Sequence, residues 1–280
     1  MHFNFDFNAV QILWTLTFAV HLVLLVVLLG RDRMRRFPWF TASIVLVALR
    51  LISSRLLFGR LPQLSMSAVF IVMADLSVLT GLMVVIEMAR RAFGGVARRT
   101  WWLWALVLLA VGTSVLALWG PWPAWKSLAI DTPIAALGVM QLISQKGLLL
   151  VSVLNIALGV LVVAFGRRFG AGWRSHVQQI VVGLSTASIA QIAEQAIFQI
   201  IIHSATPHTQ AEYLKLVSLR EKLYNANSAV YIAVVIWWIA CLWIDEPVPP
   251  APPAEEEHMV IDVPEGDALV DAEWLTKPEE

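Results

Sequence analysis

The sequence has few charged residues and almost no cysteine. Only 14% of its 280 residues are charged, whereas soluble domains carry about 25%. Hydrophobic residues make up 59% of the chain, and the mean hydropathy is +0.73. This composition excludes a soluble globular domain and is typical of a polytopic membrane protein. The single cysteine, Cys241, excludes an intramolecular disulfide and a thiolate metal cluster.

The sequence also lacks the motifs that usually indicate a reaction. No GxSxG, HExxH or paired-carboxylate pattern is present. The last apolar run has no lysine for a retinal Schiff base, and His21 has no second histidine at matching depth to complete a haem site. We therefore expect no cofactor and have no positive indication of an enzyme. Enzymatic activity stays an open alternative.

The chain contains seven apolar runs, each long enough to cross the hydrocarbon core, which takes about 20 residues in a helix. We predict an all-α polytopic bundle within residues 1–245, with these spans: 9–29, 37–58, 66–89, 101–119, 148–166, 180–203 and 228–245. The start, MHFNFDFNAV, lacks the basic n-region of a secretory signal. The first run is therefore expected to be a retained helix.

Basic residues are concentrated in the first, third and fifth connections between these spans. RDRMRR (31–36) and RRAFGGVARR (90–99) hold four arginines each, and RRFGAGWR (167–174) holds three. Cytoplasmic loops carry an excess of Lys and Arg, so we predict an outside N-terminus and a cytoplasmic C-terminus. These arginines would attract anionic lipid headgroups and need no nucleic acid as partner.

The first apolar helix and the block GRDRMRRFPWF resemble uncharacterised seven-helix integral membrane proteins of bacteria, over residues 1–60. The resemblance implies a multi-pass protein of the inner membrane and carries no activity. A fainter similarity links the chain to the seven-helix sensor regions that precede bacterial signalling enzymes. The sequence departs from those regions because no kinase, cyclase or phosphodiesterase domain follows.

Two polar or interrupted segments flank the later spans. Residues 128–144 are apolar, but Asp131 and Pro133 interrupt them, so we expect an interfacial or re-entrant helix rather than an eighth span. Residues 209–227 form either a second surface helix or an outward extension of the last span. The tail, 246–280, is acidic and rich in proline and is predicted to be disordered. It is either inert or a docking peptide for a cytoplasmic partner or for the basic loops.

Several spans carry a polar or ionisable residue at a similar depth. Counting from the outer ends of their spans at about 1.5 Å per residue, Arg50, Asp75 and Glu194 lie at about 12–14 Å. Arg50 and Asp75 are expected to pair, because the short turn between their helices makes these helices neighbours. The complete candidate site comprises Arg50, Asp75, Glu194, Gln191, Gln195, His21 and Asn155.

Two interpretations of this polar set stay open. Ion pairs and glutamine stripes can hold membrane helices together, and intramembrane ionisable groups can equally form a ligand, ion or proton site. A separate and weaker candidate is a metal site at His203, His208 and Glu212, whose spacing matches no tight zinc site. We expect no metal there.

The functional hypothesis is an outward-facing polar site in a receptor-like or sensory module that signals to a separate cytoplasmic partner. The first alternative is a small proton-coupled transporter or permease that uses Glu194, Asp75 and Arg50. The second is a structural or accessory subunit of a larger membrane complex, in which the charges only stabilise the bundle. Besides these protein partners, the lipid bilayer is the expected environment.

Overall fold

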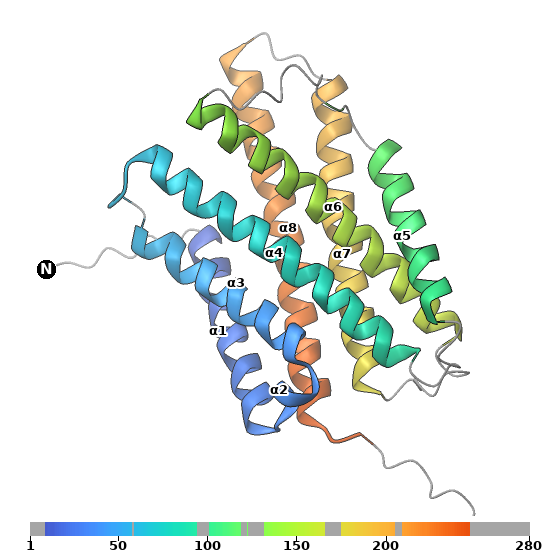
Figure 1. The fold of residues 1–280 in the computed structure, drawn as a ribbon. Helices are drawn as coiled ribbons and strands as arrows, with labels where there is room; N and C mark the ends of the chain where they lie inside the picture. The colour runs from blue at the N-terminus through green and yellow to red at the C-terminus, as the bar shows by residue number, and fades with distance from the viewer. Residues whose placement is uncertain are drawn as a thin grey trace, which may run out of the picture. The chain divides into compact units, whose positions relative to one another are not determined.

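The computed structural model describes residues 9–57, 59–93, 101–118, 122, 132–165, 175–204 and 209–246, and these residues form eight helices and no strand (Figure 1). The predicted all-α fold is thus confirmed for the described part of the chain. The helices are α1 (Ala9–Gly30), α2 (Arg33–Arg36), α3 (Pro38–Leu57), α4 (Gln63–Ala92), α5 (Trp101–Leu118), α6 (Pro133–Phe165), α7 (His176–Ser204) and α8 (Gln210–Trp243).

Six of these helices, α1, α3, α4, α6, α7 and α8, are long and apolar enough to cross a membrane. Large apolar side chains cover their outer surfaces, and Val26, Val160 and Ile200 are each more than 60% exposed. A soluble monomer rarely exposes so much contiguous apolar surface. A helix satisfies its own backbone hydrogen bonds, which is the requirement for burial in lipid. The chain is a multi-pass membrane protein.

The prediction for residues 128–144 is wrong where the structure describes them. Helix α6 begins at Pro133 rather than at 148 and runs without a break to Phe165. Pro133 opens the helix instead of interrupting it, because the first turn needs no backbone donor there. Thr132 precedes it and accepts a hydrogen bond from the backbone N–H of Ala135 at 3.2 Å. Residues 128–131 lie outside the described residues.

Helix α8 resolves the alternatives for residues 209–227 in favour of an extension of the last span. It begins at Gln210 and reaches Trp243 as one helix of 34 residues. Thr209 caps its N-terminus and exchanges hydrogen bonds with Glu212 in a capping box. At about 1.5 Å per residue the helix is about 50 Å long, which exceeds the thickness of the hydrocarbon core.

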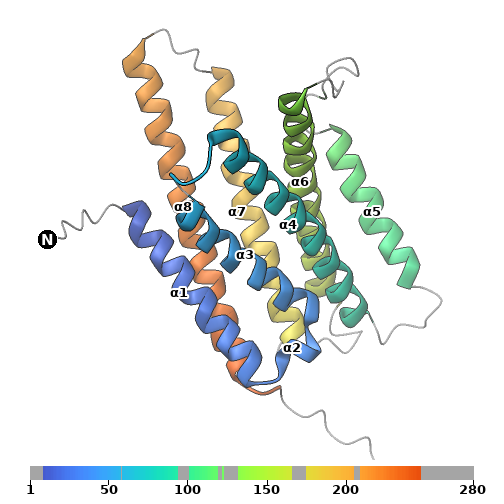
Figure 2. The same cartoon turned by 60° about the vertical axis from the view of Figure 1, so that its left-hand side comes forward.

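The contacts between helices define their relative directions (Figures 1 and 2). In α4 and α6, Asp75 contacts Ser144, and Val78 lies against Gly147, so both helices run the same way. The segment between them must therefore return to the opposite end, and α5 is the helix that runs along this return. Helices α1 and α8 are also parallel. His21 of α1 contacts Tyr231 of α8, and Arg31, directly after α1, contacts Trp243 at the end of α8.

Small residues allow α7 to approach its two neighbours closely. A Cβ added at Gly159 of α6 would lie 2.0 Å from Oγ of Ser185, and one added at Gly183 of α7 would lie 2.2 Å from Nε1 of Trp238. Close backbone approach through small residues is the usual way in which membrane helices associate. These two contacts fix α6, α7 and α8 against one another in the part of the bundle that holds most of the polar side chains.

Candidate functional site

A network of polar side chains joins α6, α7 and α8 inside the bundle. Asn155 donates to Ser188 at 3.2 Å, and Ser152 donates to Gln191 at 3.4 Å. One turn further along α7, Glu194 accepts a hydrogen bond from the amide of Asn227 at 2.6 Å. Ser188, Gln191 and Glu194 of α7 therefore face the neighbouring helices. Gln195 is half-buried, and the structure gives it no hydrogen-bond partner among the described residues.

His21 joins α1 to α8 in the same region. Its side chain is fully buried, Nδ1 lies 2.6 Å from the carbonyl oxygen of Thr17, and Nε2 lies 2.9 Å from the hydroxyl of Tyr231. A carbonyl only accepts, so Nδ1 carries a proton; in the neutral imidazole Nε2 then accepts from Tyr231. His21 is a hydrogen-bonded core residue in this arrangement.

Two adjoining cavities lie beside these groups. The central cavity, of about 300 Å³, lies between α3, α6, α7 and α8 and is lined by Phe40, Ser43, Ile44, Val47, Asn155, Leu184, Ala187, Ser188, Gln191, Asn227, Tyr231 and Trp238. The arginine cavity, of about 470 Å³, lies between α1, α3, α4 and α8 and is lined by Leu13, Trp14, Thr17, Val47, Arg50, Leu51, Ser54, Phe70, Tyr224, Asn225, Asn227, Ser228 and Tyr231. Three residues, Val47, Asn227 and Tyr231, line both cavities, so the two cavities adjoin.

Unpaired polar atoms are concentrated around this region. Eight buried side-chain nitrogen or oxygen atoms of the described residues have no hydrogen-bond partner. Four of them belong to residues that line the two cavities: Trp14 Nε1, Asn225 Oδ1, Asn155 Oδ1 and Trp238 Nε1. Buried polar groups in proteins are normally paired, so each exception needs an explanation. The four atoms are themselves buried, so they place unsatisfied polar groups in the walls of the two cavities without exposing them.

The predicted pairing of Arg50 with Asp75 is wrong. Within the described part of the chain Arg50 forms no ion pair, and Asp75 instead accepts a hydrogen bond from the hydroxyl of Ser144 on α6. Phe70 is the α4 residue that reaches the cavity of Arg50. Asp75 follows it by five positions, which places it about 140° around the helix. Depth was predicted for both residues, but the side of the helix was not.

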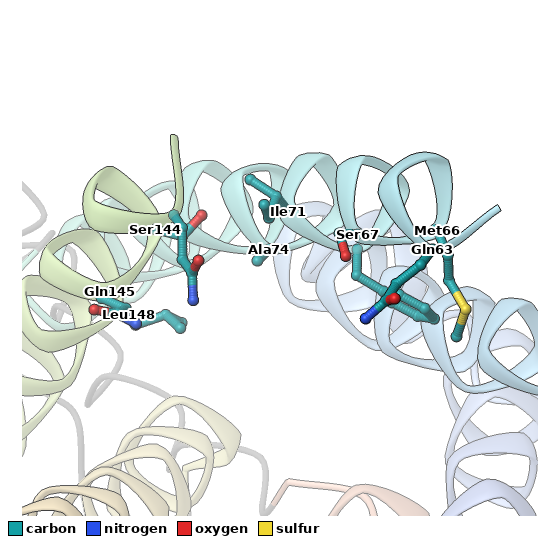
Figure 3. Close-up of a pocket in the computed structure, with 10 residues that line it drawn as sticks. Gln63, Met66, Ser67, Ile71, Ala74, Ser144, Gln145 and Leu148 are labelled. Carbon is teal, nitrogen blue, oxygen red and sulfur yellow. The ribbon is translucent and has the colours of Figure 1, made fainter. Parts of the chain in front are cut away.

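Asp75 and Ser144 lie near a third and larger cavity, of about 660 Å³, between α4 and α6. Figure 3 shows its lining, with Gln63, Met66 and Ser67 from α4 and Gln145 and Leu148 from α6. The lining contains amides and hydroxyls and no charged side chain. The smaller arginine cavity is the stronger candidate for a ligand site, because its lining combines the guanidinium of Arg50 with one unpaired buried donor, Trp14 Nε1, and one unpaired buried acceptor, Asn225 Oδ1.

A second polar cluster at the opposite end of the bundle was missed by the sequence reasoning. We name Arg31, Arg33, Arg36, His176, Asp245 and Glu246 the C-terminal clasp. Asp245 lies 2.6 Å from Arg33, and the Glu246 carboxylate lies 2.5 Å from Arg36 and accepts from the backbone N–H of His176 at 2.6 Å. Glu246, assigned to the disordered tail by the sequence, thus belongs to the bundle.

The clasp favours the ionised form of Glu246. Partial burial acts to raise its pKa, but the backbone N–H of His176 and the guanidinium of Arg36 outweigh burial, and the pKa lies below its ordinary value. The signal for this contact was present in the sequence. Two acids follow the last span directly, and a run of arginines lies on the same predicted side of the membrane.

Glu87 is a buried acidic side chain that the sequence reasoning missed. It is buried near the end of α4 and accepts a hydrogen bond from the backbone N–H of Phe40 at 3.0 Å. Phe40 lies in the first turn of α3, where backbone donors have no partner within the helix. Arg91, four residues after Glu87, lies 3.8 Å from the second carboxylate oxygen. Glu87 therefore caps α3 from a neighbouring helix.

The weak metal candidate receives no support from the described residues, in which no group of three His, Cys, Asp or Glu side chains could hold an ion. Glu212 takes part in the capping box of α8. His208 and the side chain of His203 lie outside the described residues.

A further polar stripe, on α8, was also missed. Tyr224, Asn227, Ser228 and Tyr231 recur at i, i+3, i+4 and i+7, which is one helix face. All four line the arginine cavity.

The comparisons with protein families, with curated proteins and with solved structures found no match to this chain.

Proposed function

We propose that the chain is a receptor-like sensory module of the bacterial inner membrane. A ligand that enters the arginine and central cavities from the outer side would change the position of α8, and the change would reach a separate cytoplasmic partner through residues 246–280. The proposal includes seven membrane passes with an outside N-terminus and a cytoplasmic C-terminus. The partner and the ligand are separate molecules that bind at opposite ends of the bundle.

The directions of the helices support the seven passes. Helices α4 and α6 are parallel, so α5 makes a return between them, and its 18 residues cover about 27 Å. Helices α1 and α8 are parallel too, which requires an odd number of passes. The C-terminal clasp gathers arginines of the first connection, and Arg91 of the third lies over Phe37 at the same end. The excess of Lys and Arg in cytoplasmic loops favours a cytoplasmic location for this end.

The single observation that carries the proposal is the path of α8. This helix contributes Asn227 and Tyr231 to both cavities, and it leads directly to Asp245 and Glu246 in the C-terminal clasp. A rigid helix that has one part in a ligand site and its end in a set of ion pairs can transmit a small shift between them. The clasp is partly exposed, with the Asp245 side chain 73% exposed. Exposed ion pairs contribute about 0–1 kcal/mol each, so a modest ligand preference would suffice to open it.

The transporter alternative has less support. Transport sites are usually built from broken helices at corresponding positions of two repeats. Helices α6, α7 and α8 run unbroken past the cavities. Proton-coupled uptake into vesicles would favour the transporter, and co-purification of a stoichiometric membrane partner would favour the accessory subunit. Stabilisation by a ligand without transport would favour the sensor.

The test fills the central cavity with a larger side chain and measures whether the distance across the C-terminal clasp changes. Spin labels at positions 35 and 244, in a Cys241→Ser chain, report the distance between α2 and the end of α8 by electron–electron double resonance. Ala187→Phe and Ser43→Phe fill the central cavity from two different helices. Ala193→Phe is the matched control, because Ala193 is exposed on α7. We expect both fillings to shift the distance distribution and the control to leave it unchanged. A distribution that is unchanged in folded, cavity-filled chains would refute the coupling.

A further inference from the structure

The chemistry of the arginine cavity specifies the class of ligand. We propose that it binds an amphiphilic anion whose carboxylate or phosphate oxygens contact Arg50 and the indole N–H of Trp14, with an apolar body against the aromatic lining. This inference rests on the proposed ligand site and adds the identity of the group that the site recognises. The anionic group belongs either to a free organic acid or to the headgroup of a lipid.

The first observation is an imbalance of charge. The linings of the two cavities contain one cation, Arg50, and no aspartate or glutamate. Arg50 forms no ion pair with any described residue, whereas the guanidinium of Arg55, five residues later, lies over the ring of Trp14 at 4.7 Å. Charged side chains within a membrane protein are normally paired or functional. A guanidinium is suited to a planar or tetrahedral oxyanion, which it can bind through two parallel hydrogen bonds.

The second observation is independent of charge. Nε1 of Trp14 is buried and has no hydrogen-bond partner in the described part of the chain, and Trp14 lines the same cavity as Arg50. An indole N–H is a donor only, so the group that satisfies it must be an acceptor. Trp14 of α1 and Arg50 of α3 thus bring two donors to the wall of one cavity, where the unpaired oxygen of Asn225 is an acceptor. The group common to both requirements is an acceptor oxygen with negative charge.

The remaining lining describes the rest of the molecule. Leu13, Leu51 and Phe70 are apolar, and the rings of Tyr224 and Tyr231 add aromatic faces with polar tips. The cavity volume of about 470 Å³ lies within the range of small-molecule sites, about 300–1,000 Å³. A compact anion with an aromatic or short aliphatic body fits this combination. A strongly cationic ligand does not, because Arg50 would repel it.

The experiment compares matched anionic and neutral probes on the full-length protein. Phenylacetate and phenylacetamide are titrated into protein in maltoside detergent, and binding is measured by calorimetry and by the shift in unfolding temperature. The lipid source is tested in nanodiscs of phosphatidylcholine with and without phosphatidylglycerol. The variants are Arg50→Gln and Trp14→Phe, and the control is Arg60→Gln, an exposed arginine outside the cavities.

We expect one anion source, phenylacetate or phosphatidylglycerol, to stabilise the wild type at a concentration at least tenfold lower than its neutral counterpart requires. Arg50→Gln should remove this preference, Trp14→Phe should weaken binding severalfold, and Arg60→Gln should leave it unchanged. The source that produces the effect identifies a free acid or a lipid. If neither anion is preferred, or if Arg50→Gln retains the preference, the inference is wrong.

The outcomes separate this inference from the proposed function. Anion binding through Arg50 with an unchanged distance between positions 35 and 244 would support the site and contradict signalling through α8. A clasp that moves in the cavity-filled variants, without preference for either anion, would support signalling and contradict the anionic ligand.

Discussion

Glu246, the last described residue of the chain, binds the first residue of α7, with its carboxylate 2.6 Å from the backbone N–H of His176. The imidazole Nε2 of His176 lies 2.9 Å from the carbonyl oxygen of Ile244 and donates to it. The end of α8 is therefore attached to α7 by both side chain and backbone. Because α8 also lines the cavities, this attachment links the ligand site to the beginning of the tail.

Removal of the charge on Glu246 should destabilise the bundle. Hydrogen bonds to charged groups contribute about 1.5–3 kcal/mol when buried, and Glu246 is only partly buried, so Glu246→Gln should lower the free energy of unfolding by about 1–2 kcal/mol. Asp32→Asn is the control, since among the described residues Asp32 pairs only with the exposed Arg35, and its positive φ tolerates asparagine. Unfolding in detergent mixtures measures both. An effect of Glu246→Gln no larger than that of the control would contradict the assignment.

The same contact predicts a pH dependence. The pKa of Glu246 is lower in the folded protein than its ordinary value, so its stabilising effect is complete above the unfolded pKa, about 4.3. The effect is lost as the pH falls through the folded pKa. The difference in unfolding free energy between wild type and Glu246→Gln should thus be largest near pH 7 and shrink below about pH 5. A difference that is constant from neutral to acidic pH would show that another property of the glutamate matters.

Periodicity and hydropathy were sufficient to predict the helices but not all of their starts. Five spans agree with the observed helices within a few residues, whereas α6 and α8 begin far earlier than predicted. Residues 133–147 are apolar as well, and the start of α6 was misplaced because Pro133 was interpreted as an interruption. The start of α8 was misplaced because residues 210–227 are polar, and hydropathy does not mark the polar part of a helix. The true starts were encoded in capping chemistry, by Thr132 with Pro133 and by Thr209 with Glu212.

The candidate site was predicted in part for a related reason. Counting residues gives the depth of a side chain, and His21, Asn155 and Gln191 do lie among the helices at the cavities or beside them. Counting does not give the rotation of each helix, because rotation depends on how neighbouring helices pack. Asp75 therefore faces α6 and not Arg50. The residue types alone do not show that Gly147 of α6 packs against Val78 of α4, which is the contact that turns Asp75 towards α6.

A methyl group at Gly159 should separate α6 from α7. The added Cβ would lie 2.0 Å from Oγ and 2.8 Å from Cβ of Ser185, so one helix must move. Overpacking of this kind costs about 1–3 kcal/mol. Gly138→Ala is the matched control on the same helix, with no atom within 4 Å of its Cβ, and it should be neutral or stabilise by up to about 1 kcal/mol. Equal effects of the two substitutions on the unfolding temperature would argue against close packing at Gly159.

Double-mutant cycles should distinguish the two partners proposed for Asp75. Asp75 accepts a hydrogen bond from Ser144 and makes no ion pair with Arg50. The effects of Asp75→Ala and Ser144→Ala on the free energy of unfolding should therefore be non-additive by about 0.5–2 kcal/mol, whereas Asp75→Ala and Arg50→Ala should add within about 0.5 kcal/mol. Arg50→Ala alone should preserve or increase stability, because it removes a cation that forms no ion pair with any described residue. Such a result would mean that Arg50 is retained at a cost to the fold, as expected for a residue that binds a ligand. Strong coupling of Arg50 to Asp75 would instead restore the structural interpretation of both charges.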